Sequence, residues 1–170
     1  LWWPDAQSGN QRAISAMEKM MRTLVPLVLA ALIQAPAAQA QVMGDPEVIR
    51  LLMADFGLPA KLVTDGAGDP LIESRIDGTS FQVYFYQCEK TCAAIQFSAG
   101  FDLDDAMPES MANRWNREKR FGKVWLDETG DPFIEMDIGV AGDGIGRKNF
   151  DGALDTWRIV LSDFRDFIDW

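Results

Sequence analysis

The segment from Phe81 to Ala99 restricts the possible folds of this chain more than any other part of the sequence. On both sides of a pair of cysteines, apolar and polar residues alternate, as they do on strands with one buried face. If Cys88 lies opposite Cys92, the apolar residues form three cross-strand pairs: Phe85 with Ile95, Val83 with Phe97, and Phe81 with Ala99. All of them then share one face, and a slip of one residue would turn them to the other face. The sequence therefore predicts a β-hairpin with a short loop at residues 89–91.

Cys88 and Cys92 are the two cysteines of the chain, and their opposed positions predict a disulfide bond. Opposed residues of a hairpin lie within the Cα separation that a disulfide tolerates. The bond closes a short loop, so it stabilises the domain by at most about 2–3 kcal/mol. The alternative is a redox-active pair, although the spacing is Cys-x-x-x-Cys and no helix start follows to lower a thiol pKa. Two thiolates without further soft ligands also make a poor zinc site.

The rest of the chain adds helices and further hairpins. Apolar residues at helical spacing predict helices at residues 45–57, 106–120 and 149–168. Alternating or apolar segments predict the remaining strands, at residues 62–64, 71–76, 123–127 and 133–138. The resulting order is α-β-β-β-β-α-β-β-α, in which hairpins dominate and no βα unit repeats. This order indicates an α+β fold with two layers, a largely antiparallel sheet with helices packed on it.

Start signals and apolar spacing also predict which residues of the helices face inward. Asp45 is expected to cap the first helix, and Asp104 or Asp105 the second. The inner residues of the first helix are expected to be Val48, Ile49, Leu52 and Phe56. Those of the second are Met107, Met111 and Trp115. The glycine-rich residues 139–146 are expected to be a loop that leads into the last helix.

Residues 17–40 have the three parts of a secretory signal peptide. Lys19 and Arg22 supply positive charge, residues 24–33 are an apolar run, and Ala38-Gln39-Ala40 supplies the cleavage motif. The apolar run is shorter than the about 20 residues that a transmembrane helix needs.

We therefore expect a bacterial protein that is periplasmic or secreted, without a stable membrane anchor after cleavage. A single domain is expected at residues 41–170. Residues 1–16 precede the signal, and we expect them either to come from a start site assigned too early or to be disordered.

Composition excludes several classes of function. The chain has no histidine, which removes Ser-His-Asp and Cys-His catalysis and the commonest metal ligand. Its net charge of −10 repels the phosphate backbone, so we expect no nucleic-acid partner. The acid-rich segments 102–105 and 127–131 could hold calcium or a general acid–base pair, but helix starts and turns select the same residues. We expect neither a metal ion nor a cofactor.

A basic run and two aromatic residues supply candidates for a binding surface. The basic residues are Arg114, Arg117, Lys119, Arg120 and Lys123. Such a run is typical of a solvated helix face that pairs with nearby acids, and the alternative is a contact site for an acidic partner or an anionic membrane. Trp125 and Phe133 fall on the sheet face opposite the apolar strand pattern. Aromatic side chains there either lie under another segment or anchor an interface.

A string of residues in the second half of the chain is similar to that of a known family. It comprises Asn113-Arg114-Trp115-Asn116, Arg120-Phe121, Val124-Trp125-Leu126-Asp127, Gly130-Asp131, Met136-Asp137 and a final helix around Trp157. This string resembles the YbjN family, over roughly residues 45–168. The resemblance implies a fold similar to that of type III secretion chaperones, small α+β proteins that pair as dimers and hold partner segments against a sheet. It implies a sensory or regulatory binding role, not catalysis.

These observations predict a non-enzymatic binding module in the periplasm, chaperone-like or regulatory, that engages a protein or peptide partner and can form a homodimer. The candidate binding-surface residues are Trp115, Arg120, Trp125 and Phe133. Two alternatives stay open. One is a hydrolase or transferase that uses paired carboxylates with raised pKa values. The other is a small redox protein that uses Cys88 and Cys92.

Overall fold

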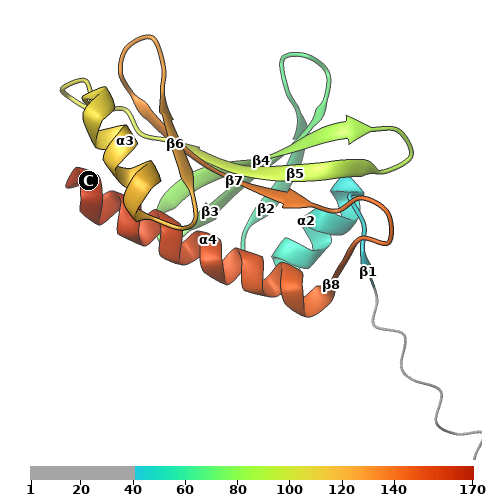
Figure 1. Cartoon of the computed structure of the whole chain (residues 1–170). Helices are drawn as coiled ribbons and strands as arrows, with labels where there is room; N and C mark the ends of the chain where they lie inside the picture. The colour runs from blue at the N-terminus through green and yellow to red at the C-terminus, as the bar shows by residue number, and fades with distance from the viewer. Residues whose placement is uncertain (1–40) are drawn as a thin grey trace, which may run out of the picture. The chain divides into compact units, whose positions relative to one another are not determined.

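Six strands form one antiparallel sheet in the computed structural model, which describes residues 41–170 (Figure 1). Across the sheet they are β2 (Ala60–Thr64), β3 (Pro70–Ile76), β4 (Thr79–Cys88), β5 (Cys92–Gly100), β7 (Pro132–Gly139) and β6 (Lys123–Leu126). The first four follow one another in chain order, whereas β7 pairs with β5 and leaves β6 at the edge. The predicted signal peptide at residues 17–40 and the preceding residues 1–16 lie outside the described part of the chain.

Three helices complete the predicted order of elements: α2 (Pro46–Asp55), α3 (Glu109–Glu118) and α4 (Arg147–Ile168). The α+β fold class and the order α-β-β-β-β-α-β-β-α are thus confirmed. The structure adds a second, two-stranded sheet of β1 (Gln41–Val42) and β8 (Ile145–Gly146). β8 falls in residues 139–146, where the sequence predicts only a loop.

The hairpin of β4 and β5 has the predicted register. Val83 pairs with Phe97, Phe85 with Ile95, and Cys88 with Cys92. The preceding connection is a two-residue turn in which Asp77 and Gly78 have φ angles of 45° and 86°. Positive φ at both central residues is the type I′ geometry, whose twist matches that of the strands it joins.

Cys88 and Cys92 form a disulfide across the end of this hairpin, with their Cα atoms 3.9 Å apart. Cys92 is buried, and its N–H donates to the carbonyl of Gly44 over 2.9 Å, so the bond lies beside the start of the described chain. Replacing both cysteines with alanine should lower the free energy of unfolding by at most about 2–3 kcal/mol, because the closed loop is short. Urea denaturation of the variant and the wild type measures this loss.

The same disulfide separates the structural interpretation from the redox one. In a glutathione buffer of cytosolic potential, a structural bond should stay oxidised. If the bond opens under these mild conditions while the domain stays folded, the redox alternative for Cys88 and Cys92 gains support.

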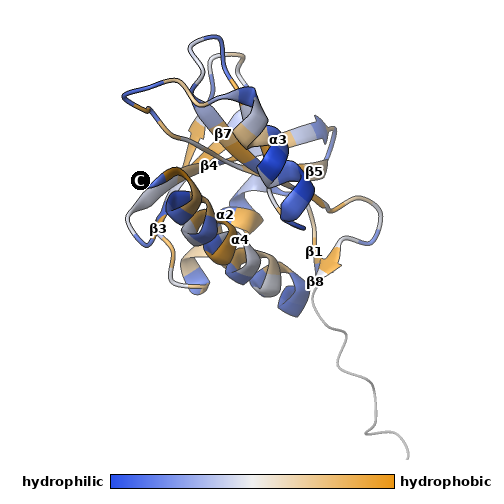
Figure 2. Cartoon of the chain, turned by 60° about the vertical axis from the view of Figure 1, so that its left-hand side comes forward, coloured by the Kyte–Doolittle hydropathy of each residue, from blue (hydrophilic) through white to orange (hydrophobic). Residues whose placement is uncertain are grey.

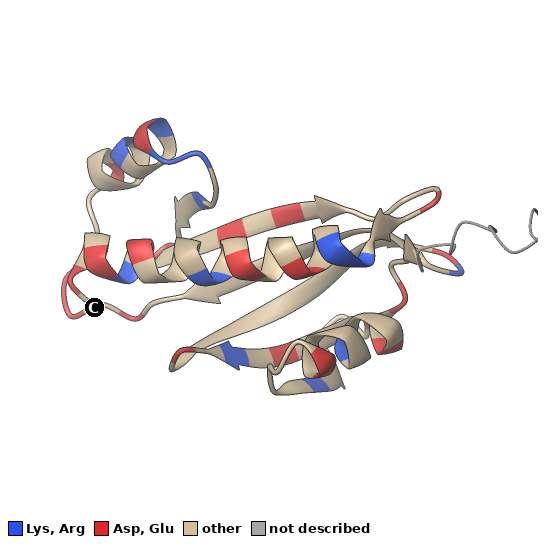
Figure 3. Cartoon of the chain, turned by 90° about the horizontal axis from the view of Figure 1, so that it is seen from below, with Lys and Arg blue, Asp and Glu red and all other residues tan. Residues whose placement is uncertain are grey.

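Helix α4 lies along one face of the sheet and provides much of the core (Figure 1). Its buried residues recur at helical spacing: Phe150, Leu154, Trp157, Val160, Leu161 and Phe164. Trp157 packs against Phe81 and Phe97, with ring centroids 5.9 and 5.8 Å away. Figure 2 shows hydrophobic and hydrophilic residues alternating along α4, and Figure 3 shows acids and bases on its outer side. The helix is therefore amphipathic, as predicted.

Helix α2 starts as predicted but buries a different set of residues. The Asp45 carboxylate accepts from the N–H groups of Glu47 and Val48 over 2.9 and 3.0 Å, which confirms the cap. The prediction for Val48 is wrong, since its side chain is 40% exposed. Met53 is fully buried together with Ile49, four residues before it. The buried stripe of α2 is therefore turned away from Val48.

Helix α3 is shorter than predicted, and the expected caps are wrong. The N-cap residue is Pro108, and neither Asp104 nor Asp105 caps the helix. The N–H of Met107 donates to the carbonyl of Gly130 over 3.0 Å. Because this bond holds residue 107 against the β6–β7 connection, the helix begins only after Pro108.

Candidate functional site

The face of the six-stranded sheet opposite α2 and α4 has no helix over it within residues 41–170 (Figures 1 and 3). The strand register orders its residues in rows. The middle row consists of Lys61, Glu73, Gln82, Ser98, Glu135 and Lys123. One neighbouring row consists of Val63, Leu71, Tyr84, Gln96 and Asp137. The other contains Gly100, Phe133 and Trp125. We call this surface the open face.

Trp125 and Phe133 meet on the open face, as their strand positions predict. Their rings are stacked, with centroids 4.6 Å apart and planes inclined by 14°. Trp125 is 40% exposed, and its Nε1 donates to a carboxylate oxygen of Glu135 over 2.7 Å. A Cβ atom at Gly100 would lie 2.6 Å from the Phe133 ring, so the glycine allows this ring to lie flat on the sheet. The pair therefore combines an accessible aromatic surface with a fixed orientation.

A hydrogen-bonded polar network lies next to this pair. The Tyr86 hydroxyl donates to Oε1 of Gln96 over 3.0 Å, and Nε2 of Gln96 donates to Asp137 over 2.8 Å. The Tyr84 hydroxyl donates to Gln82 over 2.7 Å. Partial burial, reinforced by nearby carboxylates, raises the pKa of both tyrosines. Both phenols consequently stay protonated at physiological pH and can act as hydrogen-bond donors.

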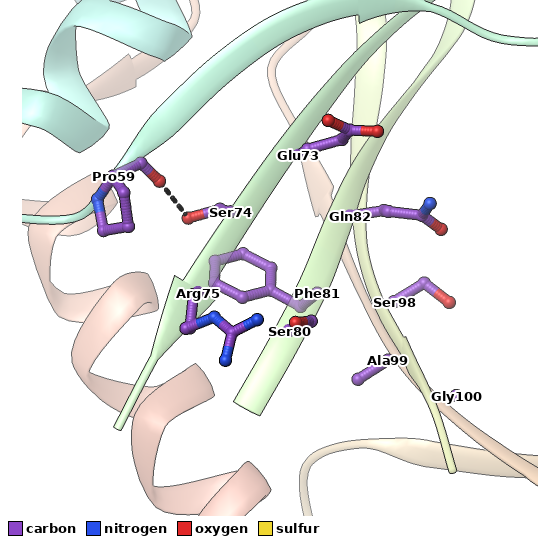
Figure 4. Close-up of a pocket in the computed structure, with 10 residues that line it drawn as sticks. All are labelled: Pro59, Glu73, Ser74, Arg75, Ser80, Phe81, Gln82, Ser98, Ala99 and Gly100. Carbon is purple, nitrogen blue, oxygen red and sulfur yellow. Dashed lines mark hydrogen bonds between the residues drawn. The ribbon is translucent and has the colours of Figure 1, made fainter. Parts of the chain in front are cut away.

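A hollow of about 570 Å³ lies beside the open face where β3, β4 and β5 meet (Figure 4). Glu73, Gln82 and Ser98 stand next to one another along it, and Arg75 and Ser80 border its end. Pro59 also lines it, and its carbonyl accepts from Ser74 over 2.7 Å. These groups offer charge and hydrogen bonds, the means by which a surface recognises a polar peptide.

Trp115, a candidate for the binding surface, lies inside the core and is 1% exposed. Its ring packs edge-on against Phe164 of α4, with centroids 5.0 Å apart. Its Nε1 donates to the carbonyl of Gly122 over 2.8 Å. The assignment of Trp115 to an accessible surface is therefore wrong, because the inward stripe of α3 carries it into the core.

The basic run mostly pairs with acids or lies over aromatic rings. Lys119 pairs with Asp163 over 2.7 Å, and Lys123 with Glu135 over 3.3 Å. Arg117 contacts Glu118 over 3.7 Å, and the Arg114 guanidinium lies 4.7 Å from the ring centre of Phe167. These contacts favour the interpretation as a solvated helix face.

Arg120 differs from the rest of the basic run. It forms no ion pair with an acid in the described part of the chain, and its guanidinium lies 5.5 Å from the ring centre of Phe121. It lines a second hollow, which also includes Glu135. Arg120 therefore does not contact the stacked aromatic pair, but Glu135 is a neighbour of both.

Asn116 closes the outer edge of β6, a role that the sequence does not reveal. Its Nδ2 donates to the carbonyl of Val124 over 2.9 Å, and its Oδ1 accepts from the N–H of Val124 over 2.8 Å. One side chain thus satisfies both outward groups of this edge residue, which prevents another strand from pairing there.

The acid-rich segment 127–131 forms a hydrogen-bonded turn. Asp127 accepts hydrogen bonds from Thr129 and from the N–H of Asp131, and these bonds lower its pKa. The pKa of Glu47 is also lowered, mainly by its hydrogen bond to Arg50. A general acid needs the opposite shift, a raised pKa. Residues 41–170 contain no group of three acids or cysteines placed to hold a metal ion.

Sequence reasoning missed the network of Tyr86, Gln96 and Asp137 and the edge role of Asn116. The polar half of the alternation in residues 81–99 was the available signal for the network, because those residues must face away from the core. No helix within residues 41–170 is long and apolar enough to cross a membrane.

Comparison with known proteins identifies the family. No curated protein and no solved structure matches the chain. The model of the YbjN family, described as "putative bacterial sensory transduction regulator", matches residues 45–170. This match covers most of the chain and nearly all of the described fold, so the chain belongs to the YbjN family.

Proposed function

We propose that the chain is a non-enzymatic regulatory or chaperone-like module of the periplasm that binds a protein or peptide partner on the open face. The stacked and accessible pair of Trp125 and Phe133 is the observation that carries this proposal. Aromatic side chains of this kind dominate binding energies when a partner covers them. The description of the family as a regulator supports a role in binding.

The remainder of the open face fits a protein partner better than a reaction. Gln82, Gln96 and two tyrosines present hydrogen-bonding groups at the spacing of a sheet. Such a surface can hold an extended segment along its length through many moderate contacts.

The periplasmic part of the proposal is supported by the signal peptide that the sequence predicts at residues 17–40. Cell fractionation of a bacterium that expresses the whole chain tests this part. Recovery in the periplasmic fraction with Gln41 at the new N-terminus is the expected result, and retention of the uncleaved chain in the cytoplasm would contradict it.

Alanine at Trp125 should weaken partner retention at least about tenfold while leaving the fold intact, because the side chain is 40% exposed and stacks on Phe133 outside the core. The measurement is affinity capture from periplasmic extract, with mass spectrometry of the retained proteins and light scattering of the free protein to test for a homodimer. Circular dichroism monitors folding.

Alanine at Ile159 is the matched control, because Ile159 is 62% exposed and belongs to α4, which covers the other face of the sheet. It should retain the same partners as the wild type. If the Trp125 variant also retains them unchanged, the open face is not the binding surface. If alanine at Trp125 and at Phe133 both unfold the domain, these residues belong to the core and the proposed site is wrong.

A further inference from the structure

Strand β7 extends beyond its neighbour β6 and leaves part of its own edge without a partner. β7 has eight residues and β6 has four, which pair only with Pro132 to Glu135. On that side, residues 136–139 have no strand beside them in the described part of the chain. We call this gap in the sheet the β7 notch.

The main-chain groups that face the β7 notch belong to Asp137 and Gly139. The carbonyl of Pro132 accepts from Phe101, and the N–H of Val140 donates to Ala93, so even-numbered residues of this segment bond toward β5. In an antiparallel ladder the bonding direction alternates from one residue to the next. The main-chain N–H and C=O of Asp137 therefore point into the notch, where an added strand could bond to both.

A hollow of about 480 Å³ lies at the notch, and its lining includes Asp137 and Glu135 of β7 and, from the segment before β6, Arg120 and the half-exposed Phe121. The two carboxylates already accept hydrogen bonds, Asp137 from Gln96 and Glu135 from Trp125.

Three cations and two acids line this hollow, so its lining carries a net positive charge. Lys119 and Lys123 also line it, and each is engaged by one acid. Arg120 forms no ion pair with an acid of residues 41–170. Asp137 likewise has no ion-pair partner in residues 41–170, but the three cations of the lining outnumber its two acids. The lining as a whole therefore attracts an anion, on a chain whose net charge is −10.

We propose that an extended peptide segment with acidic residues at its C-terminal end binds in the β7 notch as an added strand. Its main chain bonds to Asp137, and its carboxylates meet Arg120. Such a strand runs antiparallel to β7 and in the same direction as β6, so its C-terminal end lies next to the start of β6. Asn116 closes the outer edge of β6, so a strand cannot add there instead. This inference rests on the proposed function, because it specifies the chemistry of a protein partner.

The test uses two fluorescein-labelled peptides of alternating valine and threonine with amidated C-termini. One carries two glutamates at its C-terminal end and the other carries two lysines. Fluorescence anisotropy with residues 41–170 of the chain should show that the glutamate peptide binds at least about tenfold more tightly than the lysine peptide. Equal affinities would contradict the charge assignment.

Two pairs of variants separate main-chain pairing from charge. D137P removes the outward N–H and D137A retains it, and proline is tolerated at an edge position whose N–H bonds to no neighbour. The proline variant should lose binding at least about tenfold more than the alanine variant. R120E should lose binding, whereas K148E, a charge reversal at another exposed cation, should not.

If D137P fails to fold, peptides N-methylated at single positions replace it. Methylation should abolish binding at alternate positions and be tolerated between them, since a strand bonds to its neighbour with every second residue. Tolerance at every position would overturn strand addition. If the wild type does not bind the glutamate peptide, this inference is wrong. If the Trp125 variant nevertheless loses partner capture, the proposed function still stands.

Discussion

Replacing Trp115 with alanine should lower the free energy of unfolding by about 3–5 kcal/mol, the usual cost of removing a buried large aromatic side chain. Trp115 is 1% exposed, and its ring packs edge-on against Phe164 and Phe167 with centroids 5.0 and 5.3 Å away. The substitution would open a cavity between α3 and α4 and leave the carbonyl of Gly122 without its donor. Urea denaturation followed by circular dichroism measures the loss.

Phenylalanine at the two buried tryptophans separates the hydrogen bond from the packing. Nε1 of Trp115 donates to Gly122 over 2.8 Å, whereas the buried Nε1 of Trp157 has no partner in the described part of the chain. W115F removes a hydrogen bond that the wild type forms, whereas W157F removes an N–H that has no acceptor. W157F should therefore lower the free energy of unfolding less than W115F. Equal losses would contradict this reasoning, and an undiminished stability of W115A would contradict the core position of Trp115.

Alanine at Gly122 should lower the free energy of unfolding by about 2–4 kcal/mol, from overpacking and backbone strain. Gly122 has a φ angle of 77°, which is unfavourable for a residue with a side chain. An added Cβ would also lie 2.7 Å from Val160 and 3.0 Å from Ile134. The turn that carries the acceptor of Trp115 would have to move.

Gly152 provides the opposite case and the matched control. It lies within α4, and no atom surrounds the position of an added Cβ within 4 Å. Alanine there should stabilise the domain by about 0.5–1 kcal/mol, since glycine lowers helix stability. Chemical denaturation of both variants measures the free energy of unfolding, which should fall for G122A and rise for G152A. A neutral G122A would show that the turn accommodates the side chain and that its conformation is not strained.

The sequence was a good guide wherever a structural feature is local. The register of β4 and β5 follows from alternation and a short loop, and the same alternation places Trp125 and Phe133 on one face. For Trp115 two expectations disagreed: helical spacing placed it inward, and it was also named as a candidate for the binding surface. The spacing was correct, because α3 packs its stripe against α4.

Features that depend on distant strands could not be predicted. The β7 notch exists because β7 pairs with β5 and because β6 begins only at Lys123, and neither fact is visible in either strand alone. The short α3 has a similar cause, since the bond from Met107 to Gly130 joins residues far apart in the sequence. The caps predicted at Asp104 and Asp105 failed because this contact determines where the helix can begin.

The pairing of β1 with β8 limits how far the chain can be trimmed from its N-terminal side. Val42 is 2% exposed and pairs with Ile145, directly before α4 begins. The carbonyl of Gly44, two residues later, accepts from Cys92. A processing enzyme that removed Gln41 and Val42 would uncover part of the core and leave β8, directly before α4, without its partner strand. Cleavage that preserves the domain must therefore occur before Gln41, and overdigestion by even two residues should increase its susceptibility to proteolysis.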